Sequence, residues 1–176
     1  MLEIRQETSC DHLAVKELLL LAFQGVPHSD QQEHLLVERL RLCDAFVPEL
    51  SLVACESEQL LGHILLTEVD LEGSLPPEVK LLALAPLAVL PARQKQGIGA
   101  SLLEEARLKA IDLGYAGIVL LGSPAYYSKF GYRPLSAFKI KLPLDVPPDY
   151  CQGLELFPKA LRGVKGTIIY PPAFGV

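Results

Sequence analysis

Two short stretches of this chain combine glycines with polar residues in a way that could bind or act on a charged ligand. The first reads QKQGIG at residues 94–99, after an apolar run that starts at Leu81 and before an amphipathic segment. The first N–H groups of a helix have no partner inside the helix, and the helix dipole adds positive potential. A glycine turn at a helix start can therefore hold a pyrophosphate, because no side chain keeps the anion from the backbone.

The second stretch reads GSPAYYSKFGY and runs from Gly122 to Tyr132. It follows a short apolar segment, residues 116–121, that is predicted to be a strand. This strand would lie parallel to the apolar run at residues 81–89, joined to it through the helix by a right-handed crossover. The two stretches are therefore predicted to follow parallel strands on either side of one helix.

Two common phosphate-binding motifs do not fit residues 94–101. A P-loop ends in Gly-Lys-Ser/Thr, whereas Gly99 is followed by Ala100 and Ser101. A dinucleotide-binding turn needs a third glycine three residues after the second, where this chain has Leu102, and an acid about 20 residues further on. Residues 118–121 offer no acid.

Residues 94–99 resemble instead the Gln/Arg-x-x-Gly-x-Gly/Ala motif of the GNAT superfamily of acyl-CoA-dependent N-acetyltransferases. Residues 127–132 resemble the family's Tyr-x-x-Leu/Phe-Gly-Phe/Tyr motif, and the Gly-x-Pro-x-Tyr before it is similar to a branch of predicted acetyltransferases. The resemblance implies the GNAT fold, an α/β (α+β) domain spanning residues 1–176. Its central sheet would be mixed and mostly antiparallel, with about seven strands, a splayed parallel pair and flanking helices.

The resemblance also implies an activity, the transfer of an acetyl group from acetyl-CoA to a primary amine of a small molecule or protein. The acceptor amine must lose a proton first, because a lysine-like amine has a pKa of about 10.4. Backbone N–H groups at the splayed strand would polarise the acetyl carbonyl. Tyr127 is the candidate general acid, donating a hydrogen bond to the leaving thiolate. The residues implied for acetyl-CoA binding are Leu87, Ala88, Val89, Gln94, Lys95, Gln96, Gly97, Ile98, Gly99, Ala100 and Ser101.

Other roles in this reaction stay open at the level of sequence. The general base could be Glu33, Glu68 or His63, or a chain of water molecules could carry the proton. Tyr126 is expected to point to another side than Tyr127. A non-catalytic module that binds acyl-CoA as a sensor or partner is the alternative function, and a longer acyl donor is a third. The resemblance further implies a homodimer in which edge strands pair.

Hydrophobic periodicity predicts the elements that would position these residues. Strands are expected at residues 2–7, 50–56, 60–71, 81–89, 116–121, 137–142 and 164–170, with a bend at Pro86 in the fourth. Helices are expected at residues 9–23, around residues 35–42 and at residues 97–113. Ser9 or Asp11 is expected to cap the first helix and Ser29 or Asp30 the second, and residues 73–77 are expected to form a loop.

Composition narrows the class of protein. At 176 residues and 50% hydrophobic, the chain is predicted to form one domain. It shows neither a signal peptide nor a membrane span, and its four cysteines and four histidines lack metal-site spacing, so we expect a cytoplasmic protein without a metal. The net charge of −5 argues against nucleic acid as the main partner. Acids predominate at residues 26–80 and bases at residues 91–141, which would suit a cationic acceptor beside an anionic cofactor.

Overall fold

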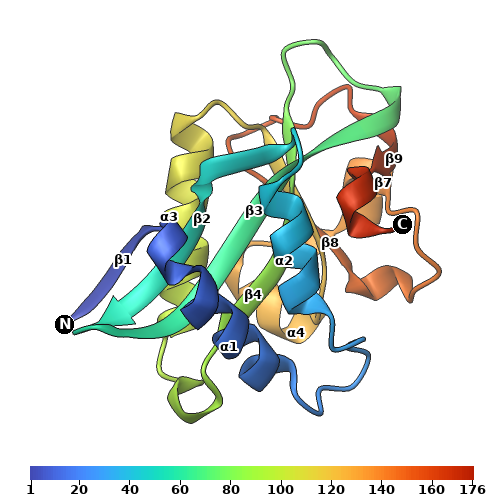
Figure 1. The fold of residues 1–176 in the computed structure, drawn as a ribbon. Coiled ribbons are helices and arrows are strands. Elements are labelled where there is room, and N and C mark those ends of the chain that lie inside the picture. Colours follow the sequence, from blue (N-terminus) through green and yellow to red (C-terminus); the bar gives the residue numbers. More distant parts are fainter.

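The computed structural model describes residues 1–176 and shows a mixed, mostly antiparallel sheet of nine strands, against the expected seven or so (Figure 1). The main path runs in the order β1-β2-β3-β4-β5-β8-β6, and β9 pairs with both β3 and β7. The strands are β1 (Leu2–Gln6), β2 (Phe46–Glu56), β3 (Gln59–Ser74), β4 (Leu81–Val89), β5 (Gly117–Leu121), β6 (Arg133–Pro134), β7 (Ile140–Lys141), β8 (Cys151–Glu155) and β9 (Lys165–Ile169). The helices are α1 (His12–Phe23), α2 (Glu33–Arg41), α3 (Ile98–Asp112) and α4 (Pro124–Tyr127).

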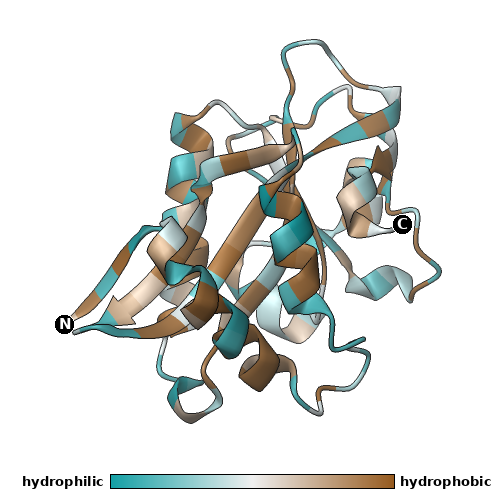
Figure 2. Ribbon diagram, viewed as in Figure 1, coloured by the Kyte–Doolittle hydropathy of each residue, from teal (hydrophilic) through white to brown (hydrophobic).

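Helices cover the two faces of the sheet, because neighbouring residues of each central strand point to opposite sides. Leu52 of β2 packs in the cluster that holds α3, whereas Val53 packs under α1 and α2. The helix pair lies across the near face of the sheet in Figure 1. Figure 2 shows the central strands β3 and β4 largely hydrophobic, as burial on both faces requires. No helix is both long enough and apolar enough to cross a membrane.

The parallel strands β4 and β5 separate after a short contact. They are paired only from Leu81 to Ala83 of β4, whereas β4 stays paired with β3 as far as Val89. The register between β3 and β4 shifts between Ile64 and Leu66, opposite Pro86 and its neighbours, so the predicted bend is confirmed. A gap therefore opens between the end of β4 and the end of β5, which pairs with β8 on its other side.

Several predicted elements need correction. The β2–β3 hairpin is confirmed, but β3 continues through Gly73 and Ser74, which were expected in a loop. Residues 137–142 do not form one strand, because Lys139 has a φ of 60° and divides a 3-10 turn from the two-residue β7. The strand β8 was not predicted at all. Its central Gly153 breaks the hydrophobic pattern, and it lies against Leu135, whose side chain would meet a Cβ there.

The caps of the first two helices also differ from expectation. Asp11 is the N-cap residue of α1, one of the two positions expected, but its carboxylate caps the preceding 3-10 turn instead, where the Thr8 backbone N–H donates to Asp11 Oδ2 at 2.7 Å. The second helix begins at Glu33, whose carboxylate accepts a hydrogen bond from the Ser29 hydroxyl. Each predicted position therefore lies close to the helix start but plays a different part in the local hydrogen bonding.

Candidate active site

A pocket of about 650 Å³ lies between the end of β4, the start of α3 and α4. Eight of the residues predicted for cofactor binding line it together with Tyr127: Leu87, Val89, Gln94, Lys95, Gly97, Ile98, Gly99 and Ala100. Three predicted residues do not line it: Ala88, Gln96 and Ser101. The structure thus brings the two motifs to one cavity, although 27 residues of sequence separate Gly99 from Tyr126.

The three residues outside the pocket are held elsewhere by their own packing. Ala88 is 4% exposed and packs beneath α1 and α2, because it points to the opposite face from Leu87 and Val89. Gln96 accepts a hydrogen bond from Arg93 Nε at 3.0 Å, and the Ser101 hydroxyl donates back to Gly97 O at 3.1 Å. The side chain of Ala88 is therefore buried in the core, whereas those of Gln96 and Ser101 form hydrogen bonds within the loop and the first turn of α3.

The start of α3 presents free backbone donors to the pocket. The first bond inside the helix joins Ser101 N–H to Gly97 O at 3.0 Å, so the N–H groups of residues 97–100 have no helical partner. Gly97 has a φ of 86°, a left-handed conformation that favours glycine. The free donors and the dipole of the 15-residue helix make this end of the pocket an anion site.

Three cationic side chains also line the pocket: Arg93, Lys95 and Lys129. Arg93 is held by an ion pair to Glu56, with its Nη2 2.9 Å from Oε2, which offsets its charge. Lys129 Nζ lies 5.6 Å from the ring centroid of Tyr126. Lys95 and Lys129 therefore contribute most of the side-chain positive charge of the pocket.

The requirement for glycine at position 99 has a separate cause. A Cβ at Gly99 would come within 2.7 Å of the hydroxyl oxygen of Tyr126, whereas a Cβ at Gly97 would meet no atom within 4 Å. Tyr126 therefore lies across the first turn of α3 and lines the pocket with Tyr127. The expectation that Tyr126 points elsewhere was wrong, because both tyrosines of the short helix α4 border the same cavity.

The end of β4 supplies backbone groups to the gap. Leu90 N–H donates to Leu61 O of β3 at 2.8 Å, and successive residues of a strand alternate in direction. The N–H and C=O groups of Leu87 and Val89 therefore point away from β3, toward the gap left by β5. Val89 O accepts a hydrogen bond from Gln94 Nε2 at 3.2 Å, whereas the N–H groups of Leu87 and Val89 lie beyond the pairing with β5, which ends at Ala83.

Tyr127 lies in an aromatic cluster at the base of the pocket. Its ring centroid is 5.0 Å from that of Tyr126 and 5.5 Å from that of Tyr132, both in edge-to-face arrangements. A Cβ at Gly122 would overlap the Tyr127 ring, so this glycine permits the close packing. Burial raises the pKa of the Tyr127 phenol well above 10, and the neighbouring Tyr126 adds to the effect. The hydroxyl therefore keeps its proton at neutral pH and can act as a donor.

None of the three candidate bases lines the pocket. His63 is fully buried, with Nε2 3.2 Å from the Ser51 hydroxyl, and burial lowers its pKa to about 4. Glu68 accepts a hydrogen bond from the Tyr115 hydroxyl, and Glu33 accepts one from Ser29. Phe130 was predicted only as part of the second motif and not as a site residue, yet it lines the pocket beside Tyr126 with ring centroids 5.2 Å apart. Its place in that motif was the available signal.

Comparisons with known proteins agree with this arrangement. Residues 48–134 match a family model described as an acetyltransferase (GNAT) domain. The chain is 31% identical over 172 residues to the uncharacterized N-acetyltransferase YhbS of Escherichia coli, covering 97% of both chains. The crystal structure of YhbS with CoA superimposes with a TM-score of 0.88 at 30% identity, covering 99% of this chain and 92% of that one. A GNAT family acetyltransferase from Brucella melitensis in complex with acetyl-CoA gives a TM-score of 0.80 at 33% identity, covering 99% and 98%.

Proposed function

Because the chain belongs to the GNAT family of N-acetyltransferases, we propose that it moves an acetyl group from acetyl-CoA directly to a primary amine within a ternary complex. The observation that carries this proposal is the pocket itself. It joins an anion site at the start of α3, free backbone groups at the end of β4 and the protonated phenol of Tyr127. The relatives solved with CoA and acetyl-CoA share this fold over nearly the whole chain, which supports the choice of cofactor.

The lining residues suit the parts of acetyl-CoA. The free N–H groups at Gly97, Ile98, Gly99 and Ala100 would hold the pyrophosphate, with Lys95 and Lys129 as nearby cations. The backbone of Leu87 and Val89 would pair with the amide groups of the pantetheine arm, as an added strand pairs with a sheet edge. Acetyl-CoA supplies the thioester, whose acetyl group passes to the neutral amine as the CoA thiol leaves.

Three groups of the chain would act on the reaction. The Leu87 N–H would donate to the carbonyl oxygen of the acetyl group, where negative charge develops. The strand holds this donor in place, so no reorganisation is needed. Tyr127 would donate a hydrogen bond from its hydroxyl to the developing thiolate, and burial, which raises its pKa, keeps the phenol protonated. Since no candidate base lines the pocket, water would take the proton of the amine.

The presence of Tyr127 in the pocket favours an enzyme over a module that only binds acyl-CoA. A binder has no use for a proton donor at the sulfur. The acceptor would approach from the side of the acid-rich residues 26–80, which favours a cationic amine.

The proposal is tested by thiol release from acetyl-CoA over a panel of polyamines, amino acids, aminoglycosides and lysine peptides. We expect at least one amine to raise release above the rate without amine. Cys10 is exposed and will react with thiol reagents, so each assay needs a protein blank without acetyl-CoA. Tight binding of acetyl-CoA without stimulation by any amine in the panel would favour the binding module instead.

Gly99→Ala should weaken acetyl-CoA binding by about tenfold or more, because the added methyl group would displace Tyr126 and narrow the anion site. Isothermal titration calorimetry measures the change. The double variant Gly99→Ala/Tyr126→Phe is the matched control. The next ring atom of Tyr126 is 4.0 Å from the Cβ position, so removing the hydroxyl relieves the clash and should restore part of the affinity. Unchanged affinity in the single variant would contradict this arrangement.

A further inference from the structure

A second pocket, of about 700 Å³, gathers four positively charged side chains and shares no lining residue with the active site. They are Lys139, Lys159, Arg162 and Lys165, which come from the turn before β7, the loop after β8 and the start of β9. One carboxylate, Glu155, also lines the pocket. The volume lies within the range of ordinary small-molecule sites.

These four cations have no carboxylate within 4.0 Å, although ion pairs are common elsewhere in the chain. Of the twelve other lysines and arginines, six form such pairs: Arg5, Lys16, Arg41, Arg93, Arg107 and Lys109. Like charges that share a pocket without partners repel one another, and a bound anion would turn this repulsion into attraction. The concentration stands out in a chain whose net charge is −5.

The walls of this pocket are fixed by close backbone packing. Gly73 of β3 lies directly opposite Gly166 of β9, and a Cβ on either would overlap the backbone of the other strand. The Ser74 hydroxyl donates to Gly163 O at 2.9 Å, which ties the end of β3 to the loop that carries Arg162. The site is therefore formed before a ligand binds, so little of the binding free energy is needed to order its side chains and loops.

Two of the four lysine and arginine residues have unusual backbone conformations. Lys139 has a φ of 60° and Lys159 a φ of 61°, in the left-handed region that residues other than glycine rarely adopt. Such conformations persist only where the surrounding structure imposes them, and they are concentrated at binding sites. Lys139 and Lys159 both line this pocket, and a third lysine with a positive φ, Lys95, lines the active-site pocket.

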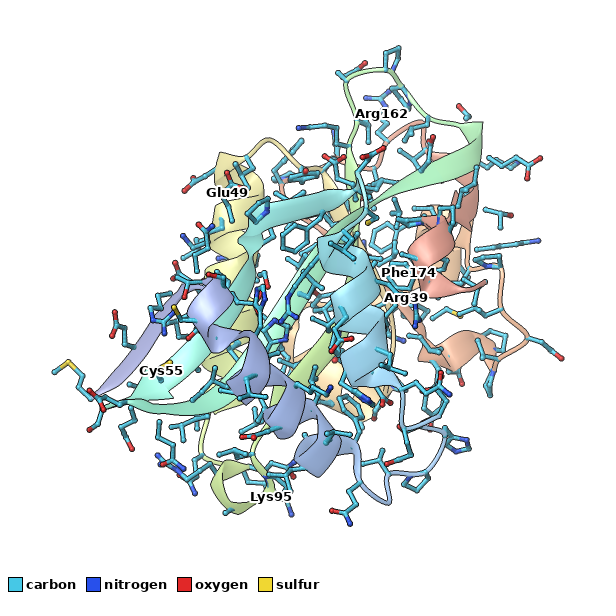
Figure 3. The ribbon with its side chains drawn as sticks, viewed as in Figure 1. Arg39, Glu49, Cys55, Lys95, Arg162 and Phe174 are labelled. Atoms are coloured by element: carbon cyan, nitrogen blue, oxygen red, sulfur yellow. The ribbon has the colours of Figure 1, made fainter.

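The cationic pocket and the active site lie at opposite ends of β5. Glu155 pairs with Gly117, the first residue of that strand, whereas Leu121 at its other end leads into α4. In Figure 3 Arg162 lies at the top of the molecule, and Lys95, beside the active site, lies at the bottom. The two pockets share no lining residue, so a ligand in one leaves the other open.

We propose that the cationic pocket binds a phosphorylated small molecule that carries several negative charges. Lysine and arginine are the residues that hold phosphate oxygens most strongly, and arginine can do so through two parallel hydrogen bonds. The buried side chains of Phe138, Leu161 and Val164 also line the pocket. The ligand therefore combines a phosphate group of multiple charge with a less polar remainder.

Inorganic triphosphate is the probe for the charged part of this ligand. It is titrated calorimetrically into the full chain at about 50 mM salt with one equivalent of CoA, so that the active site is filled and no excess CoA competes for the cationic pocket. We expect one binding site per chain, with weaker binding as salt rises. The variant Lys159→Gln/Arg162→Gln should raise Kd by about tenfold or more. A nucleoside triphosphate, which adds an apolar part, should bind more tightly than the inorganic ion.

Two control variants remove the same charge elsewhere. Lys16→Gln/Lys109→Gln alters exposed cations outside both pockets, and Lys95→Gln/Lys129→Gln alters the active site. Both should leave the Kd for triphosphate unchanged. Absence of binding, or an equal Kd in all three double variants, would overturn the proposal. So would binding to vesicles that contain phosphoinositides without binding to soluble triphosphate, because the surface would then recognise a membrane.

Discussion

A Tyr127→Phe variant should lose acceptor-dependent turnover by about 10²-fold or more while its affinity for acetyl-CoA stays within about twofold of wild type. The substitution removes one hydroxyl from an aromatic cluster and keeps the ring that packs against Tyr126, Tyr132 and Gly122. The pocket should therefore keep its shape. The loss should appear in kcat, because the hydrogen bond to sulfur strengthens only as the thiolate develops.

The pKa of Tyr127 explains why we expect Tyr127→Phe to lose most of its turnover but not all of it. A phenol with an ordinary pKa of about 10 is already a weaker acid than a thiol, whose pKa is about 8.5, and burial raises the pKa of the Tyr127 phenol further. Complete proton transfer to sulfur is therefore unfavourable, and the hydroxyl acts chiefly as a donor to the developing charge. Water can replace it in part, so some activity should remain in the variant.

Two further variants test whether a loss of turnover in Tyr127→Phe comes from its hydroxyl or from disturbance of the aromatic cluster. Tyr132→Phe removes another buried hydroxyl, in a ring that contacts Tyr127 but does not line the active-site pocket, and should keep near wild-type turnover. Tyr126→Phe tests the neighbouring hydroxyl that does line it. If Tyr127→Phe keeps turnover within about threefold of wild type, the assignment of the general acid is wrong. A large loss in Tyr126→Phe alone would move the role to that residue.

The variant Arg41→Met should lower the free energy of unfolding by about 3–5 kcal/mol, because it leaves a buried carboxylate without its partner. Glu7 and Arg41 form an ion pair in which the side chains are 3% and 11% exposed. Glu7 also accepts a hydrogen bond from the Ser51 hydroxyl at 2.6 Å, and Ser51 in turn contacts His63. The cluster joins the end of β1, β2, β3 and α2, so its loss should loosen the helix pair from the sheet.

Urea unfolding at pH 7 measures this change. Lys16→Met is the matched control, since it breaks the exposed pair with Glu38, with Nζ 3.8 Å from Oε1, and should cost less than about 1 kcal/mol. The double variant Glu7→Gln/Arg41→Met should be more stable than the sum of the single changes predicts, because it removes both buried charges. A cost for Arg41→Met no greater than that of the control would show that the buried pair does not hold α2 in place.

The pKa of Glu7 indicates how the cluster reaches its ionised state. Burial alone would raise this pKa, but hydrogen bonds from Arg41 and Ser51 and the nearby His63 lower it overall. His63 stays neutral at pH 7, because its pKa is about 4. His63 is therefore unsuited to the role of general base, because it is completely buried, which the residue type alone does not reveal.

Features that depend on neighbouring residues could be predicted without the structure. Gly97 needs a positive φ at the start of α3, and Pro86 removes a donor from β4, so both the anion site and the bend were predictable. The long elements α1, α3 and the β2–β3 hairpin were also predictable, because their hydrophobic periods extend over many residues. The two family motifs then indicated which residues meet at the end of β4.

Only the tertiary structure decided the features that depend on contacts between distant segments. A side chain at position 99 would displace Tyr126, whose hydroxyl lies over Gly99, and Ala88 points away from the pocket because the strand directs it toward α1. The cationic pocket forms because β9 returns to the end of β3 and brings Lys165 beside Lys139. Contacts of this kind produce no pattern in the local sequence, because the residues that meet belong to segments far apart in the chain. The sites form only when the sheet brings these segments together.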